Sequence, residues 1–151
     1  MLTIGDKAPE FDLPSTGTDT NLQLKDFRGK KVILYFYPRD NTPGCTKEAC
    51  SFNDHLKPIR SSGAVVLGIS ADSIESHERF AAKYGLQFPL LSDPQKTTIK
   101  AYEVWKEKTL YGRKFMGIER STFVIDEKGK IAAIFRKVNV NGHTEEVLEN
   151  M

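Results

Sequence analysis

Residues 32–37, with the sequence VILYFY, constrain the fold most, because they offer no polar face to water. A continuous run of β-branched, aliphatic and aromatic residues is typical of a strand covered on both faces, so we place it centrally in a parallel sheet. Residues 38–45 follow as a turn rich in proline and glycine, and residues 46–59 are predicted to form a helix interrupted near its end by Pro58. The order is strand, tight turn and helix.

The rest of the chain continues this alternation. An extended arm packed by Phe11 and Leu13 is expected before the first strand. In chain order, the remaining predicted elements are a polar turn at 15–21, a strand at 64–69, a helix at 73–84 stopped by Gly85, a short strand at 88–91, a helix opened by Pro94 and running toward Tyr102, a loop at 103–119, a hairpin of strands at 122–126 and 131–135, and a helix at 144–150.

Strands that alternate with helices and end in a hairpin indicate an α/β fold of the thioredoxin type. We expect a central mixed β-sheet flanked by helices, in which an antiparallel hairpin strand lies beside the parallel core. The chain of 151 residues fits one domain, 1–151, because a single hydrophobic core commonly forms at this length.

Charge and patterning exclude several classes of protein. The 22 Lys and Arg residues face 20 Asp and Glu residues without a long run of one sign, so no basic stripe suits a nucleic acid. The N-terminus lacks the charged start and apolar core of a secretion signal, and no apolar run reaches membrane-spanning length. We therefore expect a cytosolic (cytoplasmic) protein with neither nucleic-acid nor membrane partners.

Only two cysteines occur, Cys45 and Cys50. In a reducing compartment a lone pair is more often catalytic, redox-active or metal-binding than a permanent disulfide. If Thr42 caps the helix and Pro43 takes its first position, Cys45 is the third helical residue, where backbone N–H groups have no partner. The helix dipole stabilises a thiolate there by about 0.3–1 kcal/mol, whereas keeping an ordinary thiol ionised at neutral pH needs roughly 2 kcal/mol. A nearby cation is needed as well.

Arg120 is the best candidate for that cation. A strand beginning near Thr122 and antiparallel to residues 32–37 would start close to where the central strand ends. Arg39 and Lys47 are closer in sequence but rank second, because side chains near a helix start more often point to water. An arginine can also hydrogen-bond a peroxide oxygen as it becomes negative.

The five-residue spacing of the two cysteines matters for any bond between them. On an intact helix it rotates the second sulfur by about 140° and raises it by about 7.5 Å, which separates the Cα atoms by roughly 8–9 Å. A disulfide usually needs less than about 7 Å. Either the two cysteines never bond, or the helix unwinds when they do.

Simpler interpretations remain open for several of these residues. Cys50 taken alone could equally be a small buried hydrophobe. A zinc site of Cys45, Cys50 and His55 has poor spacing and too few ligands, so no metal is expected. His77 and His143 have polar neighbours in the sequence and are expected to be solvated rather than catalytic.

The segment TPGCTKEAC at 42–50 resembles the active-site sequence of a peroxiredoxin of the bacterioferritin comigratory protein (Q-type) subgroup. The resemblance covers nearly the whole chain, and it is carried by the order and spacing of several short segments together. They are GDKAPEF at 5–11, YFYP at 35–38, FPLLSD at 88–93 and GIERSTF at 117–123.

The resemblance implies specific roles. The family's Pro-x-x-x-Thr-x-x-Cys element falls on Pro38, Thr42 and Cys45, its active-site arginine on Arg120 and its resolving cysteine on Cys50. Peroxidatic Cys45 would reduce hydrogen peroxide or organic hydroperoxides, and Thr42 Oγ could accept the peroxide proton. Cys50 would resolve the sulfenic acid as an intramolecular disulfide, and thioredoxin or a similar dithiol donor would recycle it.

The resemblance further implies a thioredoxin-like fold, no cofactor and a monomer. One departure is that the chain stops soon after the segment 144–151 begins, so the last helix is expected to be short. Two other functions compete with a peroxidase. One is a thiol–disulfide oxidoreductase, although its usual Cys-x-x-Cys pair is absent. The other is a redox-switched holdase or binding protein that exposes apolar surface when the two cysteines are oxidised.

Overall fold

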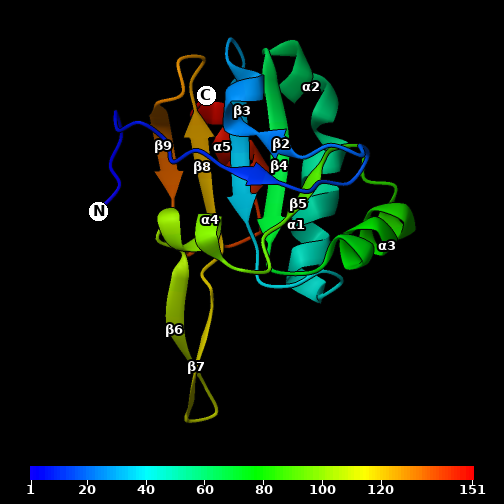
Figure 1. The fold of residues 1–151 in the computed structure, drawn as a ribbon, viewed down its shortest axis with the longest axis vertical. Coiled ribbons are helices and arrows are strands. Elements are labelled where there is room, and N and C mark those ends of the chain that lie inside the picture. Colours follow the sequence, from blue (N-terminus) through cyan, green and yellow to red (C-terminus); the bar gives the residue numbers. More distant parts are fainter.

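A five-stranded mixed sheet forms the centre of the protein in the computed structural model, which describes residues 1–151 (Figure 1). Its strands lie in the order β5-β4-β3-β8-β9. Their bounds are Leu90–Ser92 for β5, Ala64–Ser70 for β4, Lys31–Phe36 for β3, Ser121–Ile125 for β8 and Ile131–Phe135 for β9. β3, β4 and β5 are parallel, whereas β8 is antiparallel to both β3 and β9. The prediction of a central strand with an antiparallel hairpin beside the parallel core is confirmed.

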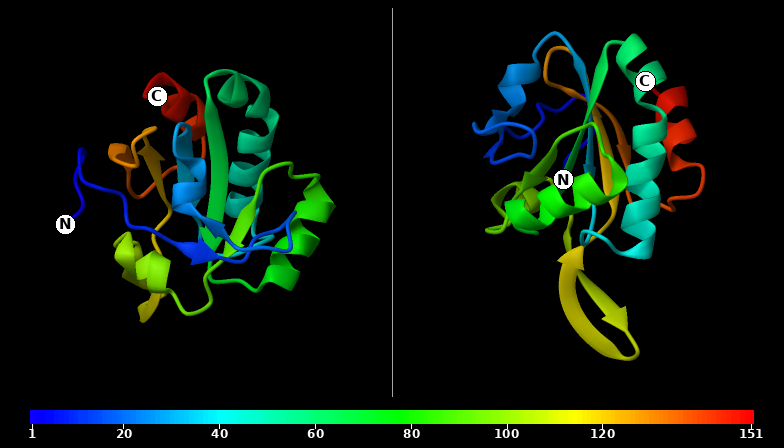
Figure 2. Two further views of the ribbon diagram at one scale, coloured as in Figure 1. Left: turned by 45° about the horizontal axis from the view of Figure 1, so that its top comes forward. Right: turned by 90° about the vertical axis from the view of Figure 1, so that its right-hand side faces the viewer.

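Helices cover both faces of this sheet (Figure 2). Alternate residues of β3 point to opposite sides, so Val32, Leu34 and Phe36 join one buried cluster and Ile33 and Tyr35 join the other. The helices are η1 Leu24–Phe27, α1 Pro43–Asp54, α2 Leu56–Ser61, α3 Ile74–Tyr84, α4 Thr97–Ala101 and α5 His143–Glu149. In the N-terminal arm, strand β1 Asp12–Leu13 pairs with β2 Leu22–Gln23. No helix has both the length and the apolar character needed to cross a bilayer.

Two local signals acted as expected. Pro58 has no N–H to bond the carbonyl of Asp54, four residues earlier, and its ring would clash with that carbonyl. The helix accordingly breaks there, with α1 ending at Asp54 and α2 beginning at Leu56. Ser73 caps α3 by accepting the N–H of Ser76, and Gly85 ends that helix at φ 62°.

The predicted loop at 103–119 was wrong, because these residues form a second hairpin, β6 Trp105–Leu110 with β7 Arg113–Ile118. Tyr111 and Gly112 have φ of 52° and 74°, which suits a two-residue turn of the type I′ kind. Most side chains of the hairpin are exposed, so no apolar alternation marked the strands in the sequence. The hairpin projects away from the central sheet, at the end of the sheet where β3 finishes and α1 begins (Figure 1).

The helix expected to open at Pro94 also needs correction. It begins three residues later, as α4 at Thr97. Lys96 precedes it in a left-handed conformation with φ of 64°, and a right-handed helix cannot continue backward through such a residue. The carboxylate of Asp93 accepts the N–H of Ile99 at 2.8 Å and so satisfies a free donor of the first turn.

Candidate active site

Cys45 lies in the first helical turn of α1, directly after the segment that connects β3 to this helix. Thr42 occupies the cap position with extended backbone, and Pro43 is the first helical residue, as predicted. The N–H groups of Gly44 and Cys45 have no backbone acceptor, so the positive end of the helix surrounds the buried sulfur. The Thr42 side chain does not cap the helix. Its Oγ1 instead donates to the carbonyl of Arg39 at 3.0 Å, which leaves the lone pairs of the oxygen free to accept a hydrogen bond.

Arg120 is the cation beside this sulfur. Antiparallel pairing of β3 with β8 places Phe36 opposite Ser121 and brings Arg120 to the end of the central strand. Its Nη2 donates to Cys45 Sγ at 3.2 Å. The two cations ranked second, Arg39 and Lys47, are exposed, and Lys47 bonds Asn141 instead.

Glu48 is a site residue that the sequence interpretation missed. Its side chain is 1% exposed, and its Oε1 accepts Arg120 Nη1 at 2.7 Å. Burial raises the pKa of Glu48 to about 7, although the Arg120 guanidinium opposes the rise. With Nη1 held by Glu48, the planar guanidinium is oriented so that Nη2 points at Cys45. The available signal was the three-residue spacing, which places Glu48 on the same side of the helix as Cys45.

Cys50 lies in the same uninterrupted helix, and both cysteines are free thiols. Cys50 is half-buried, and its pKa is raised by burial and by the nearby carboxylate of Asp54. It therefore lacks the cationic environment that surrounds Cys45. The helical geometry from Cys45 to Cys50 is the arrangement in which the two sulfurs cannot bond.

The turn between β3 and α1, which includes Pro38, is anchored through Asp40. Its buried carboxylate accepts Tyr37 Oη at 2.6 Å, Ser76 Oγ at 2.7 Å and His77 Nδ1 at 2.7 Å. Its backbone N–H donates to Asp72 at 2.8 Å. The residues just before the Thr42 cap are thus held by the first turn of α3 and by the segment that follows β4.

The expectation that His77 and His143 are solvated was wrong, because both are buried. The second nitrogen of His77 lies 2.9 Å from the carbonyl of Leu91. A carbonyl and a carboxylate only accept, so both ring nitrogens carry protons and His77 forms a buried ion pair with Asp40. His143 lies 2.7 Å from Thr122 Oγ1 and 3.2 Å from Glu146. Their polar partners lie in the folded interior rather than in water.

Asp40, Asp72 and His77 are also close enough to one another to suggest a metal site. Their polar atoms, however, already bond other protein groups. A metal ion here would have to displace the proton that joins His77 Nδ1 to the Asp40 carboxylate. The cluster is a hydrogen-bonded ion pair.

Replacing Asp40 with asparagine should lower the free energy of unfolding by about 2 kcal/mol, because the buried His77 charge loses its partner. Burial raises the pKa of Asp40, but the hydrogen bond and charge of His77 outweigh it, so the pKa lies below the ordinary 3.8. The stabilisation is therefore complete at neutral pH and is lost as pH falls through that lowered pKa. Urea unfolding at pH 7 and pH 3 measures it. Exposed Asp19→Asn is the control, and equal stability of Asp40→Asn and wild type at pH 7 would contradict the ion pair.

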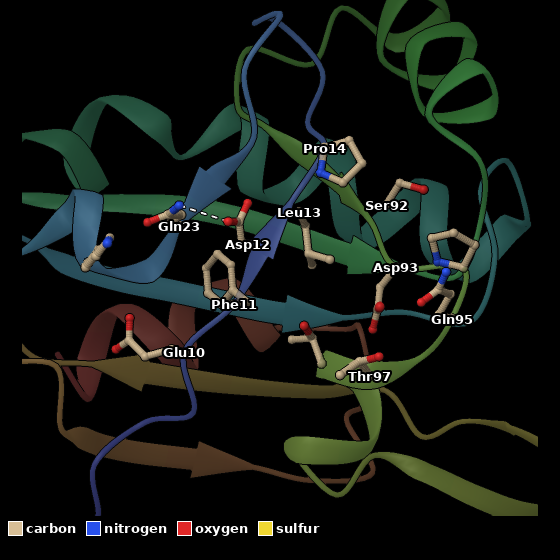
Figure 3. Close-up of a pocket in the computed structure, with 13 residues that line it drawn as sticks. Glu10, Phe11, Asp12, Leu13, Pro14, Gln23, Ser92, Asp93, Gln95 and Thr97 are labelled. Carbon is tan, nitrogen blue, oxygen red and sulfur yellow. Dashed lines mark hydrogen bonds between the residues drawn. The ribbon is translucent and has the colours of Figure 1, made fainter.

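A pocket of about 750 Å³ lies elsewhere, between the N-terminal arm and the segment from Ser92 to Thr98 (Figure 3). None of the residues predicted for the site lines it. Two of its carboxylates are already engaged. Asp12 accepts the side-chain amides of Asn21 and Gln23, and Asp93 accepts a backbone N–H of α4. The Cys45 sulfur and this pocket are thus separate features.

Comparison with known proteins gives consistent results. The AhpC/TSA family model matches residues 4–134. A protein of Coxiella burnetii named putative peroxiredoxin bcp is 52% identical over 147 residues, which cover 97% of each chain. Peroxiredoxin Bcp of Escherichia coli K12 is 42% identical over 147 residues, covering 97% of this chain and 94% of its own.

Solved structures agree with this result. A cysteine-to-serine variant of PrxQ from Xylella fastidiosa superimposes with a TM-score of 0.93 at 43% identity, covering 99% of this chain and 94% of its own. The bacterioferritin comigratory protein of Xanthomonas campestris, studied for alkyl peroxide reduction, gives a TM-score of 0.87 at 42% identity, covering 92% and 88%. The predicted thioredoxin-type fold is confirmed by these neighbours.

Proposed function

The chain belongs to the AhpC/TSA family, in its bacterioferritin comigratory protein (peroxiredoxin Q) group, and is a peroxidase; we propose that Cys45 is its peroxidatic residue and Cys50 its resolving residue. One observation carries the proposal. Cys45 Sγ lies in the first turn of α1 and accepts a hydrogen bond from Arg120 at 3.2 Å, so two sources of positive potential favour a thiolate there.

In the first step the Cys45 thiolate attacks one oxygen of the hydroperoxide. The S–O bond forms, the O–O bond breaks, and Cys45 becomes a sulfenic acid while water or an alcohol leaves. Arg120 donates to the leaving peroxide oxygen as it becomes negative, and that oxygen takes up a proton from solvent to leave as water or an alcohol. Thr42 Oγ1 accepts a hydrogen bond from the hydroperoxide O–H and so orients the substrate. Pro38 belongs to the turn that holds Thr42 in place. The substrates are hydrogen peroxide and organic hydroperoxides.

In the second step Cys50 attacks the sulfur of the sulfenic acid. A disulfide forms between Cys45 and Cys50 and water is released. Thioredoxin or a similar dithiol protein then reduces the disulfide and restores both thiols. We place the enzyme in the cytoplasm, because a redox-active cysteine pair of this kind suits a reducing compartment. We further propose that it acts as a monomer of one domain, 1–151, without a cofactor.

Peroxide consumption by the purified protein with excess dithiothreitol tests this function. A peroxidase consumes many equivalents of peroxide per protein molecule. A redox-switched holdase adds little to the slow reaction of dithiothreitol itself with peroxide, and a thiol–disulfide oxidoreductase reduces a protein disulfide faster than it reduces peroxide. Peroxide loss no faster than with dithiothreitol alone would reject the proposal.

Cys50→Ser should leave the first turnover intact and stop disulfide formation. The serine hydroxyl cannot replace the thiol as nucleophile, so sulfenic acid accumulates on Cys45 and proceeds to sulfinic acid under excess peroxide. Mass spectrometry should find one added oxygen on Cys45, then two. An unmodified Cys45 after peroxide treatment would show that it is not the peroxidatic residue.

Formation of the disulfide should unwind the start of α1, because the two sulfurs cannot meet on an intact helix. The unwinding must also release Lys47 from Asn141 and Ser51 from Thr144, whose hydroxyls lie 2.7 Å apart. Amide hydrogen exchange should show lost protection between residues 46 and 52 in the oxidised protein, while α3 keeps its protection. Identical exchange in both forms, with the disulfide confirmed by mass, would contradict the coupling.

A further inference from the structure

The β6–β7 hairpin is the most exposed apolar part of the protein. It forms its own two-stranded sheet, with no ladder to the central sheet. Of the six large hydrophobic side chains that are exposed in the whole chain, four belong to the hairpin: Leu110, Tyr111, Phe115 and Met116. A lone hairpin is only marginally stable in water, and clustered apolar surface on a soluble protein usually marks an interaction site.

The two faces of the hairpin differ in charge. The pairing of Lys108 with Phe115 and of Leu110 with Arg113 defines one face, because alternate residues of a strand point the same way. This basic face comprises Lys106, Lys108, Leu110, Arg113 and Phe115, and between residues 105 and 118 it carries three cations and no carboxylate. The opposite face carries Met116 and an ion pair of Glu107 with Lys114 at 3.7 Å, so its charges are balanced.

Lys108 on the basic face extends toward the base of the hairpin, which adjoins Arg120 in the chain. A methyl group built on Gly117 would lie 3.3 Å from Lys108 Cδ, so the lysine side chain lies along the hairpin toward its base, where Arg120 follows. Burial and the Arg120 charge lower the pKa of Lys108, while the Cys45 sulfur and the Glu119 carboxylate at the base of the hairpin oppose the shift. The views in Figures 1 and 2 show the hairpin leaving the molecule at the end where α1 begins.

We propose that the basic face of the hairpin is the docking surface for an acidic dithiol protein that reduces the oxidised enzyme, an inference that rests on the proposed catalytic cycle. A thiolate of that partner attacks one sulfur of the Cys45–Cys50 disulfide, whose S–S bond breaks and whose leaving sulfur takes up a proton. The second partner thiol then attacks the mixed disulfide. The peroxidase regains two thiols and the partner leaves as a disulfide.

The charge of the basic face and its position beside α1 favour an acidic dithiol protein as the partner. A macromolecule that brings a thiolate to the start of α1 must also meet the neighbouring hairpin. Three cations flanking Leu110 and Phe115 complement a partner with carboxylates around an apolar centre. A second copy of this chain is disfavoured, because a symmetric contact would oppose the three cations of one hairpin to those of the other.

The experiment compares two reductants, thioredoxin with its reductase and dithiothreitol, on matched variants of the two faces. Phe115→Thr on the basic face is paired with Met116→Thr on the opposite face, since the two side chains are 45% and 48% exposed. Arg113→Ser is paired with Lys114→Ser in the same way. Threonine suits a strand and neither pair alters the turn, so the hairpin should still form.

We expect Phe115→Thr and Arg113→Ser to lower kcat/KM for thioredoxin by at least about tenfold, the loss typical of a central interface residue. Both variants should keep wild-type turnover with dithiothreitol and wild-type single-turnover oxidation by peroxide. The opposite-face variants should match wild type with both reductants. The thioredoxin effect of Arg113→Ser should shrink at high salt.

Several results would overturn the inference. Unchanged thioredoxin kcat/KM in the basic-face variants rejects docking there, and so does an equal loss in the opposite-face variants. An equal loss with dithiothreitol or in peroxide oxidation means that the hairpin serves the chemistry. If the wild type dimerises or binds anionic vesicles and Phe115→Thr abolishes that association, the basic face binds a second copy of the chain or a membrane instead of a dithiol protein. Wild type that consumes no peroxide with either reductant rejects the proposed function itself, a result distinguishable from all the others.

Discussion

Cys45→Ser is expected to lower peroxide turnover by at least about 10⁴-fold, because a serine hydroxyl at neutral pH is a far poorer nucleophile than a thiolate. The change of one atom keeps the shape of a side chain that is 1% exposed, so the fold should survive. Stopped-flow measurement of peroxide consumption with excess dithiol checks the result. Thermal unfolding of the variant confirms that the loss is chemical.

The matched control is Cys50→Ser, the same substitution five residues further along α1. It should keep the first turnover at wild-type rate and lose only the later ones. Substantial turnover by Cys45→Ser would falsify the assignment of the nucleophile, whereas a slow first turnover in Cys50→Ser would mean that both sulfurs take part in peroxide attack.

Arg120→Met is expected to slow peroxide attack by about 10³-fold, because it removes both the charge beside Cys45 and a donor to the developing oxyanion. The rate of peroxide attack in Arg120→Lys should lie between those of Arg120→Met and wild type. The lysine keeps the charge but has no planar fork to hold Glu48 and Cys45 together. Second-order rate constants for Cys45 oxidation, measured over a range of pH, report the effect directly.

Arg120→Met also leaves the Glu48 carboxyl buried without its partner, which should destabilise the protein. The double variant Arg120→Met/Glu48→Gln removes that buried charge. We expect it to regain much of the stability while remaining as slow as Arg120→Met. Recovery of the rate along with the stability would assign Arg120 a structural role only.

Features encoded by local chemistry were predictable from the sequence. The start of α1 at Thr42 and Pro43, its break before Pro58 and the left-handed Gly85 after α3 each depend on the backbone chemistry of one or two residues. The approach of Arg120 to Cys45 was predictable as well, because antiparallel pairing of the strands determines which of their ends meet.

Features that depend on distant partners were not predictable. Glu48 resembles an ordinary exposed helix glutamate until Arg120 is placed against it from another strand. His77 has polar neighbours in sequence, yet Asp40 and Leu91 supply its partners inside the fold. The strands at 103–119 carry too few buried side chains to show a period, so only their hydrogen-bonded ladder reveals them.

The sequence by itself therefore determined the start of the helix that holds Cys45, from the backbone chemistry of Thr42 and Pro43, and the antiparallel neighbour that brings it a cation, from the apolar pattern of the two strands. The tertiary structure alone decided the orientation of Arg120 by Glu48, the anchoring of the turn before α1 through Asp40, and the position of the exposed β6–β7 hairpin. Those features arise from side chains far apart in the chain, whose pairing is specified by packing and burial rather than by any local pattern.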